Sequence, residues 1–388
     1  MPGRDKSLRQ RHPWVFAGSI AKVEGAPGAG DTVALHAADG AFLALAAWSP
    51  KSSIRARVWS FDTRVKIDSD FFSRRVLAAV RARDGLLDAA HNSCRLIHAE
   101  SDGLPGVIAD RYGTVLVVQL LAAGAEAWRD ALFTALSATT GCEAIYERSD
   151  ADVRALEDLP PRAGAVSGIL PQRVAAIEDG LTYFVDVAHG QKTGFYLDQR
   201  NNRRYVRALA RDCDVLNCFA YTGGFTVAAL AGGARTTLSI ESSASALELA
   251  RENVAQNGLD GDGVQWREAD VFAELRKLRD AAAQFDLIVL DPPKFAPTAQ
   301  HAEKATRAYK DINLLALKLL RPGGLLATFS CSGGVSAELF QKIVAGAALD
   351  ARTDAAILSR FGPSSDHPVA LNFPEADYLK GLLVRKNA

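Results

Sequence analysis

The chain has 388 residues, of which 48% are hydrophobic and 23% charged, and this composition predicts a globular protein with two or three domains. Its 45 basic and 45 acidic residues give a formal net charge of zero, so only local clusters of charge can indicate a nucleic-acid partner. We expect no membrane span, signal peptide, disulfide framework or metal site, because long apolar runs and C-x-x-C pairs are both missing, and we therefore expect a cytoplasmic protein.

Residues 1–70 are predicted to form a small β-rich domain. Short apolar runs at 31–36 and 41–48 flank Asp39-Gly40, a pair that favours a hairpin. Basic residues at 4–11 and 51–66 lie among aromatic side chains, and RNA contacts use this combination of phosphate neutralisation and stacking. A solvated strand face over an ordinary aromatic core would have the same composition, so both interpretations stay open.

Residues 71–185 are predicted to form an α+β middle domain. We expect a helix from Phe71 to Leu87, three strands between 94 and 121, a second helix from Glu126 to Ala138 and a strand at 144–149. The segment contains nothing that resembles a catalytic constellation, so we assign it no chemistry.

A loop rich in glycine, aromatic and basic residues follows at 190–204, between a strand at 182–187 and a helix from about 199 to 210. Gly190 and Gly194 allow the backbone to approach a ligand closely. Asp198 stands near the start of the helix, where an N-cap contributes about 1 kcal/mol. The segment is therefore either a ligand-facing loop or a capped helix with a solvated basic face.

Strands and helices alternate regularly over residues 186–388, which predicts an α/β domain with a Rossmann-like, doubly wound parallel sheet. Five of the predicted strands lie at 215–221, 235–241, 264–270, 285–291 and 325–331, and a final one at 378–385. Carboxyl ends of parallel strands share one edge of the sheet. We therefore expect Glu241, Asp270, Asp291 and Cys331 to converge there.

The stretch Thr222-Gly223-Gly224 predicts a tight turn between the first of these strands and a helix. Glu241, at the end of the next strand, suits the two hydroxyls of a ribose. The G-x-G-x-x-G fingerprint of dinucleotide sites is missing, which favours a nucleoside cofactor without pyrophosphate, such as S-adenosylmethionine (SAM). A packing turn without any ligand is the alternative.

Taken in order, Gly223-Gly224, Glu241, Asp270 and Asp291-Pro-Pro-Lys294 resemble the motifs of class I SAM-dependent methyltransferases. Further stretches resemble one branch of them, the bacterial 23S rRNA cytosine-5 methyltransferases with an N-terminal PUA domain. These stretches are 12–18, 100–106, 190–200, 217–225, 291–296 and 330–332. The resemblance implies a PUA-like RNA-binding domain at 1–70, the middle domain at 71–185 and a methyltransferase domain at 186–388.

The resemblance also implies SAM as methyl donor and a single-stranded or flipped cytosine of 23S rRNA as acceptor. Glu241 would lie at the ribose, Asp270 and Val271 at the adenine, and a third group would surround the methionine part. This third group is Phe195, Asp198, Arg200, Phe219 and Gly223, and Ser242 and Asp291 are further expected cofactor contacts. Expected RNA contacts are Lys51, Arg55, Arg57, Lys192 and Lys294. A homodimer is a further expectation, with no residue assigned to it.

Methylation of cytosine C5 requires a nucleophile that adds at C6, and a thiolate performs this role well. Cys331 is our candidate, with Asp291 at the base edge and Lys294 as a cation that could favour the thiolate. The alternative interpretation of Cys331 is an ordinary core cysteine, and this is the interpretation that we give to Cys218. Many RNA cytosine-5 methyltransferases carry a second cysteine where this chain has Pro293-Lys294, so the base that removes the C5 proton is not identified.

Three other functions remain open at this stage. Asp-Pro-Pro also occurs in enzymes that methylate exocyclic amines, so an N-methyltransferase acting on guanine or adenine of rRNA is the main alternative. A nicotinamide oxidoreductase would use the same sheet but lacks its glycine fingerprint here. A non-catalytic RNA-binding module would explain the basic clusters but would give Asp291 and Cys331 no role.

Overall fold

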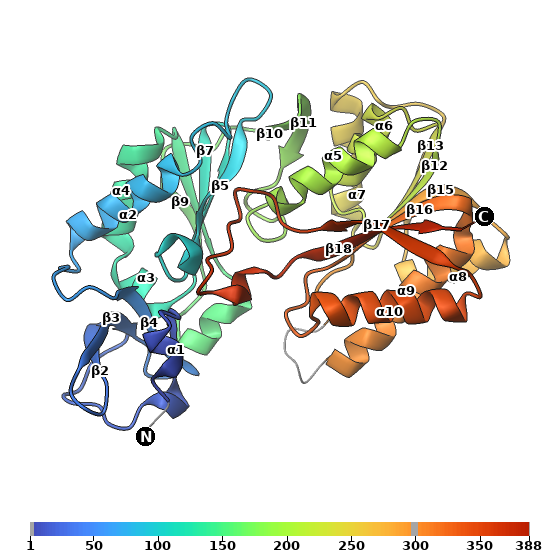
Figure 1. Cartoon of the computed structure of the whole chain (residues 1–388). Coiled ribbons are helices and arrows are strands. Elements are labelled where there is room, and N and C mark those ends of the chain that lie inside the picture. The colour runs from blue at the N-terminus through green and yellow to red at the C-terminus, as the bar shows by residue number, and fades with distance from the viewer. Residues whose placement is uncertain (1–3, 296–301, 388) are drawn as a thin grey trace. The chain divides into compact units, whose positions relative to one another are not determined.

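The computed structural model describes residues 4–295 and 302–387, so Ala296 of the motif that begins at Asp291 lies outside the described residues. The contacts divide the chain into two compact units (Figure 1). The first comprises Met1–Gly180, Val185–Leu197 and Asp366–Ala376, and the second comprises Leu181–Phe184, Asp198–Ser365 and Asp377–Ala388. The expected N-terminal domains fall in the first unit except for residues 181–184, which belong to the second, and the boundaries at 70 and 185 stay predictions.

The first unit begins with a small antiparallel sheet of order β1-β4-β3-β2. Its elements are α1 (Lys6–Arg9), β1 (Trp14–Phe16), η1 (Ala17–Ser19), β2 (Thr32–His36), β3 (Phe42–Trp48) and β4 (Ile54–Ser60). Leu8, Val15, Ala46 and Val58 are among the side chains that form its own apolar core. The expectation of a small β-rich N-terminal domain is confirmed.

A second sheet of the first unit has the order β5-β6-β7-β8-β9. The elements are α2 (Ser69–Arg81), β5 (Ser93–His98), η2 (Ala99–Asp102), β6 (Val107–Tyr112), β7 (Val115–Leu120), α3 (Ala123–Ala127), α4 (Arg129–Thr140), β8 (Ala144–Ser149), η3 (Asp152–Glu157) and β9 (Arg162–Ser167). Helices α2 and α4 lie side by side (Figure 1) and bury Phe72 and Leu132 in one core with strand residues such as Leu96. Strands β10 (Val174–Glu178) and β11 (Leu181–Val185) follow where the chain passes to the second unit.

The second unit is built on a seven-stranded sheet of order β14-β13-β12-β15-β16-β18-β17. The strands are β12 (Asp214–Cys218), β13 (Thr236–Glu241), β14 (Val264–Glu268), β15 (Phe285–Leu290), β16 (Leu320–Ser330), β17 (Ala355–Phe361) and β18 (Lys380–Lys386). β12 to β16 are parallel, whereas β18 runs antiparallel to both of its neighbours, so an entirely parallel sheet was a wrong prediction. The sequence did not predict β17, since its apolar run is only four residues long, Ala355–Leu358, and so short a run does not distinguish a strand from a helix.

Helices cover both faces of this sheet (Figure 1). They are α5 (Arg200–Leu209), α6 (Gly224–Ala231), α7 (Ala244–Gln256), α8 (Val271–Asp280), α9 (Ala302–Leu319) and α10 (Ala337–Asp350), with the short turns η4 (Leu197–Gln199) and η6 (Pro374–Ala376) elsewhere in the chain. Leu275, Ile312 and Phe340 bring α8, α9 and α10 into one core, and Val206 and Phe225 bring α5 and α6 into the other. Within the described ranges, no helix combines the length and apolarity needed to cross a membrane.

Candidate active site

Four of the predicted site residues follow successive strands at one edge of the second unit's sheet. Glu241 is the last residue of β13, Asp291 and Cys331 each come directly after β15 and β16, and Asp270 comes two residues after β14. These strands are parallel, so their carboxyl ends lie at the same edge. β15 and β16 are also direct neighbours, which places the backbones of Asp291 and Cys331 at adjacent strand ends.

The turn after β12 holds two non-glycine residues in left-handed backbone conformations. Phe219 has a φ of 61° and Tyr221 a φ of 46°, and conformations of this kind cost on the order of 1–3 kcal/mol each. Gly223 has a φ of 79°, and a Cβ built on it would lie 2.9 Å from the Cβ of Ala250 in α7. The glycine therefore serves helix packing as well as the turn, and the strain at Phe219 and Tyr221 is typical of a binding site.

Glu241 is held firmly by backbone donors. Its Oε1 accepts hydrogen bonds from the amides of Ser242 at 2.8 Å and Ser243 at 3.0 Å, and its Oε2 accepts one from Tyr221 at 2.9 Å. The carboxylate thus joins the end of β13 to the strained turn after β12. Because a carboxylate has about four acceptor positions, Oε2 can still accept from a ribose hydroxyl.

Asp270 and Val271 lie where β14 gives way to α8. One oxygen of Asp270 caps the helix by accepting from the amide of Ala273 at 2.8 Å, which leaves the second oxygen for another donor such as an exocyclic amine. Val271 is buried. Nearby, Phe219 packs against the rings of Phe272 and Phe295, with both centroid distances 6.4 Å, so an aromatic wall lines this part of the sheet edge.

Asp198 does not cap α5, contrary to one of the two interpretations of its position. The helix begins at Arg200 with Gln199 at the N-cap and no side-chain capping bond. Instead, Oδ2 of Asp198 accepts a hydrogen bond of 2.6 Å from the hydroxyl of Tyr378. Its buried Oδ1 has no hydrogen-bond partner among the described residues, and the same holds for Oγ1 of Thr222. Buried polar atoms of this kind usually meet a ligand or water.

Asp291 has a strongly altered acidity. Burial raises the pKa of its carboxyl to about 7, and the negative charge of Asp198 contributes in the same direction. A hydrogen bond with the side chain of Gln199 and the positive charge of Arg203 oppose the increase. The carboxyl is consequently divided between its protonated and ionised forms near neutral pH, which is the property expected of a group that exchanges protons with a substrate.

Cys331 is partly exposed and stands between two buried serines, Ser330 and Ser332. Burial raises the pKa of the neighbouring Tyr309 phenol, negative charge on Cys331 and Asp291 raises it further, and hydrogen bonds with the two serines oppose this. Cys218 differs, because it is fully buried in the apolar core and burial strongly raises the pKa of its thiol.

The first unit contains two of the predicted loop residues, Phe195 and Lys192. Phe195 is buried, and its carbonyl accepts a hydrogen bond of 3.2 Å from Tyr112. Lys192 is exposed and has a left-handed φ of 57°. The intervening Thr193 donates to Asp110 at 2.6 Å, which fixes this part of the loop to β6.

The predicted RNA-contact residues of the small sheet differ in exposure. Lys51 is exposed and pairs with Asp158 at 2.7 Å, and Arg55 is partly exposed. Arg57 is buried, and its guanidinium pairs with Glu157 at 2.8 Å and with Glu100 at 3.4 Å. Arg57 therefore serves an internal ion-pair network and cannot offer its charge to a phosphate in this structure. Lys294 of the second unit is exposed.

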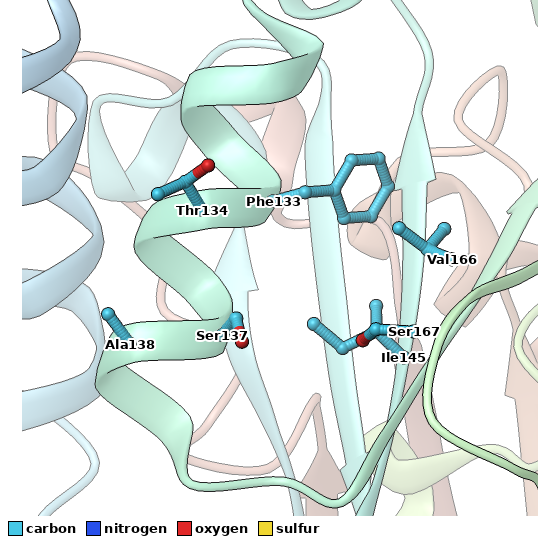
Figure 2. A pocket seen from close by; sticks show the side chains of 7 residues that line it. All are labelled: Phe133, Thr134, Ser137, Ala138, Ile145, Val166 and Ser167. Atoms are coloured by element: carbon cyan, nitrogen blue, oxygen red, sulfur yellow. The ribbon is translucent and has the colours of Figure 1, made fainter.

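A hollow of about 470 Å³ lies in the first unit and contains none of the predicted site residues. Figure 2 shows that its side chains come from α4 and from the neighbouring strands. They are Phe133, Thr134, Ser137, Ala138, Ile145, Val166 and Ser167, none of which is titratable. The described residues likewise contain no group of three or more His, Cys, Asp or Glu side chains placed to hold a metal ion.

The second unit combines this strand order with an anchored acid at the end of β13 and a strained turn after β12, and the comparisons identify it as the fold of SAM-dependent methyltransferases. A family model described as S-adenosylmethionine-dependent methyltransferase matches residues 98–350, and a PUA-like domain model matches residues 1–61. The chain therefore belongs to the S-adenosylmethionine-dependent methyltransferase family, with SAM as its cofactor.

Curated relatives match along nearly the whole chain. A protein of Shewanella denitrificans named ribosomal RNA large subunit methyltransferase I is 51% identical over 99% of this chain and 98% of its own length. A protein of Erwinia tasmaniensis with the same name is 50% identical over 99% of this chain and 97% of its own length. A solved structure described as a SAM-dependent methyltransferase from Streptococcus mutans has a TM-score of 0.86 at 22% identity, covering 99% of this chain and 98% of that one, and confirms the fold.

The chemistry of the residues present fits SAM. The anchored carboxylate of Glu241 would suit the ribose hydroxyls, the second oxygen of Asp270 would suit the adenine amine, and the buried Oδ1 of Asp198 would suit a donor such as an amino group. The site also contains residues that sequence reasoning missed, namely Gln199, Arg203, Tyr309, Tyr378 and Lys380. A lysine inside the apolar run of the last strand was a detectable signal for Lys380. Gln199 and Arg203 lie in the loop at 190–204, for which a ligand-facing role is one of the two interpretations, whereas Tyr309 and Tyr378 have no local signal.

Replacing Glu241 by alanine is expected to weaken SAM binding by about 1–3 kcal/mol, because the ribose loses a charged acceptor and the turn after β12 loses its anchor. Isothermal calorimetry measures the change. Glu248→Ala, which removes an exposed carboxylate of α7 in the same unit, is the matched control and should leave the affinity unchanged. An unchanged affinity in the Glu241 variant would remove this residue from the ribose site.

Proposed function

We propose that the chain methylates C5 of a cytosine in large-subunit ribosomal RNA. Support for the RNA comes from the relatives, whose names identify the large ribosomal subunit RNA as their substrate. The observation that carries the chemistry is the pair formed by Asp291 and Cys331 at the ends of the adjacent strands β15 and β16. A cytoplasmic location and a homodimer stay predictions that accompany this proposal.

In the proposed reaction the thiolate of Cys331 adds to C6 of the cytosine, and the C5=C6 electron pair moves to C5. Bound SAM supplies the methyl group that C5 accepts. Loss of the C5 proton then restores the C5=C6 bond as the S–C6 bond breaks, which regenerates the thiolate. A cytosine inside a duplex cannot present C6 to a thiol, so the base must be unpaired or flipped out.

Asp291 would bind the N3 and amino edge of the same cytosine. With a pKa of about 7, its carboxyl is substantially protonated at neutral pH and can donate to N3. This hydrogen bond withdraws electron density from the ring, which makes C6 more receptive to the thiolate and stabilises the charge that develops after attack. The unusual acidity of Asp291 thus has a chemical role in the proposed reaction.

RNA contacts are proposed for Lys51, Arg55, Lys192 and Lys294, and Arg57 is no longer included. The guanidinium of Arg55 lies 5.9 Å from the ring centre of Trp48, and both side chains line a hollow of about 260 Å³ in the small sheet's domain. A cation and an aromatic face beside one hollow suit a phosphate with its neighbouring base.

Reversing the charge of Lys51 and Arg55 together to glutamate is expected to weaken RNA binding and to reduce the slope of log affinity against log salt by roughly 1–2, because phosphate contacts are lost. Filter binding across a salt series measures both quantities. The matched control is Arg162→Glu, which changes an exposed arginine on the edge strand β9. An RNA affinity equal to that of the native protein would show that the small sheet is not a docking surface.

The second candidate function is a SAM-dependent N-methyltransferase that acts on guanine or adenine of rRNA, because Asp291-Pro-Pro293 is also suited to bind an exocyclic amine. Transfer of labelled methyl groups into rRNA, followed by digestion and mass spectrometry of the nucleosides, decides between the two. The proposal requires 5-methylcytidine as the product. Methylated guanosine or adenosine would replace it with the alternative.

A further inference from the structure

Lys380 is a buried lysine at the start of β18, two residues before the apolar run Leu382–Val384. It lies opposite Ser330 in the antiparallel pair with β16 and is only 9% exposed. Its Nζ donates hydrogen bonds to the carbonyl oxygens of Ser332 at 2.9 Å and Val335 at 2.7 Å. Two carbonyl acceptors favour the ammonium form, and both belong to the turn that begins one residue after Cys331.

The same turn is also held from α9. The hydroxyl of Tyr309 and Oγ of Ser332 lie 3.0 Å apart, and both side chains are fully buried. Within the turn, the amide of Val335 donates to the carbonyl of Ser332 at 3.1 Å. Ser332 is therefore fixed through its carbonyl by Lys380 and through its hydroxyl by Tyr309. Since Cys331 precedes Ser332 directly, these contacts also fix the backbone that carries the thiol.

Because Nζ of Lys380 bonds to the carbonyl of the residue after Cys331, its charge also lies near the thiol. Burial lowers the pKa of Lys380, negative charge on Asp377 and Cys331 opposes this, and the positive charge of Lys294 adds to it. Interactions between charges are reciprocal, so an ammonium that gains from a thiolate at Cys331 stabilises that thiolate equally. Thiolates are the reactive form of cysteine, and a nearby cation increases their population.

We propose that Lys380 is a positioning residue for methyl transfer, which fixes the turn after Cys331 and stabilises the Cys331 thiolate through its ammonium group. The inference rests on the proposed function, in which Cys331 is the nucleophile. In this role Lys380 acts through the turn and through its charge, since two of its three N–H donors are directed to the two backbone carbonyls.

The test measures how the rate of Cys331 alkylation by iodoacetamide depends on pH, in full-length protein without RNA, with the modified cysteine identified by mass spectrometry. Lys380→Met should move the midpoint of the profile upward by about one pH unit and slow alkylation at pH 7 roughly tenfold, because fewer thiols are ionised. Lys380→Arg, which keeps the positive charge, should largely retain the native profile. A native profile in Lys380→Met would overturn the proposal.

The same strand provides a matched control. Lys386 also donates to two backbone carbonyls, those of Leu317 at 2.9 Å and Leu320 at 2.7 Å, and burial also lowers its pKa. Lys386→Met should leave the alkylation profile unchanged, so an effect specific to Lys380 reports its charge beside the thiol. Should Lys380→Met fail to bind SAM, Lys380→Gln takes its place, and a native profile in that variant overturns the proposal in the same way.

Failure of this inference can be separated from failure of the proposed function. Alkylation of Cys331 requires neither RNA nor methyl transfer, so its pH profile tests Lys380 alone. Methylation assays on Cys331→Ala test the proposed function alone. A native alkylation profile in the Lys380 variants, together with an inactive Cys331→Ala, would remove only the role of Lys380.

Discussion

Cys331→Ala is expected to abolish methyl transfer from labelled SAM to rRNA while SAM affinity stays within about 0.5 kcal/mol of the native value. The reason is that the thiol acts on the cytosine, whereas the ribose and adenine groups of SAM are assigned to Glu241 and Asp270 on other strands. The side chain is partly exposed, so its truncation should cost little stability. Scintillation counting of methylated rRNA and calorimetry of SAM binding give the two measurements.

Cys218→Ala is the matched control for this prediction. That residue is fully buried in the core beside Leu216 and Leu290, so its loss should reduce stability modestly and leave methylation in place. RNA containing 5-fluorocytosine should form a covalent complex with the native enzyme but not with Cys331→Ala, since fluorine does not leave as a proton does. Methylation that persists in Cys331→Ala would make the N-methyltransferase the better description of the chain.

Asp291→Asn is expected to lower the rate of methyl transfer by roughly 10²–10⁴-fold, the range typical of groups that move or donate a proton in a reaction. An amide keeps the size of the carboxyl but cannot exchange a proton with N3 of the base. Single-turnover methylation with saturating SAM isolates this step from cofactor binding. Asp260→Asn, which changes an exposed carboxylate of the same unit, should react at the native rate.

The same substitution should increase stability above neutral pH. The folded-state pKa of Asp291, about 7, lies above the ordinary value of 3.8, so the folded protein binds a proton that the unfolded chain releases between these values. The contribution of Asp291 to the free energy of unfolding is fully present below pH 3.8 and is lost as the pH rises to 7. Access of water to the carboxyl reduces the size of this effect. The free energy of unfolding of Asp291→Asn should therefore exceed that of the native protein by on the order of 1–2 kcal/mol at pH 8.

Urea titrations at pH 5, 6, 7 and 8 measure this difference, which should grow with pH and level off above 7. A difference that is equal at all four values would mean that Asp291 is an ordinary exposed carboxylate. Such a result would also remove the proposed donation to N3, because an ionised carboxylate cannot donate. A variant that is more stable but less active is expected where an active site keeps an ionisable group in an environment that disfavours its charged form.

Local patterns in the sequence predicted most of the second unit. The apolar runs that become β12 to β16 each end at or just before a polar residue, and the alternation of strands with helices predicts which edge those residues share. Glu241, Asp270, Asp291 and Cys331 could therefore be chosen without coordinates. The predictions of these strands and of their shared edge succeed because hydrophobic periodicity and turn chemistry operate within windows of ten to twenty residues or so.

Tertiary structure decided which charges face solvent and which are paired inside. Arg57 belongs to a basic cluster in the sequence, yet Glu157 and Glu100 reach it from elements that lie far along the chain, and the arginine is buried. Asp291 is partly exposed, yet its pKa is raised because the fold desolvates the carboxyl and brings the negative charge of Asp198 near it. Lys380 meets the turn after Cys331 only through the antiparallel pairing of β16 with β18. The cost of removing a charge from water depends on all the groups packed around it, and residues distant in sequence supply those groups.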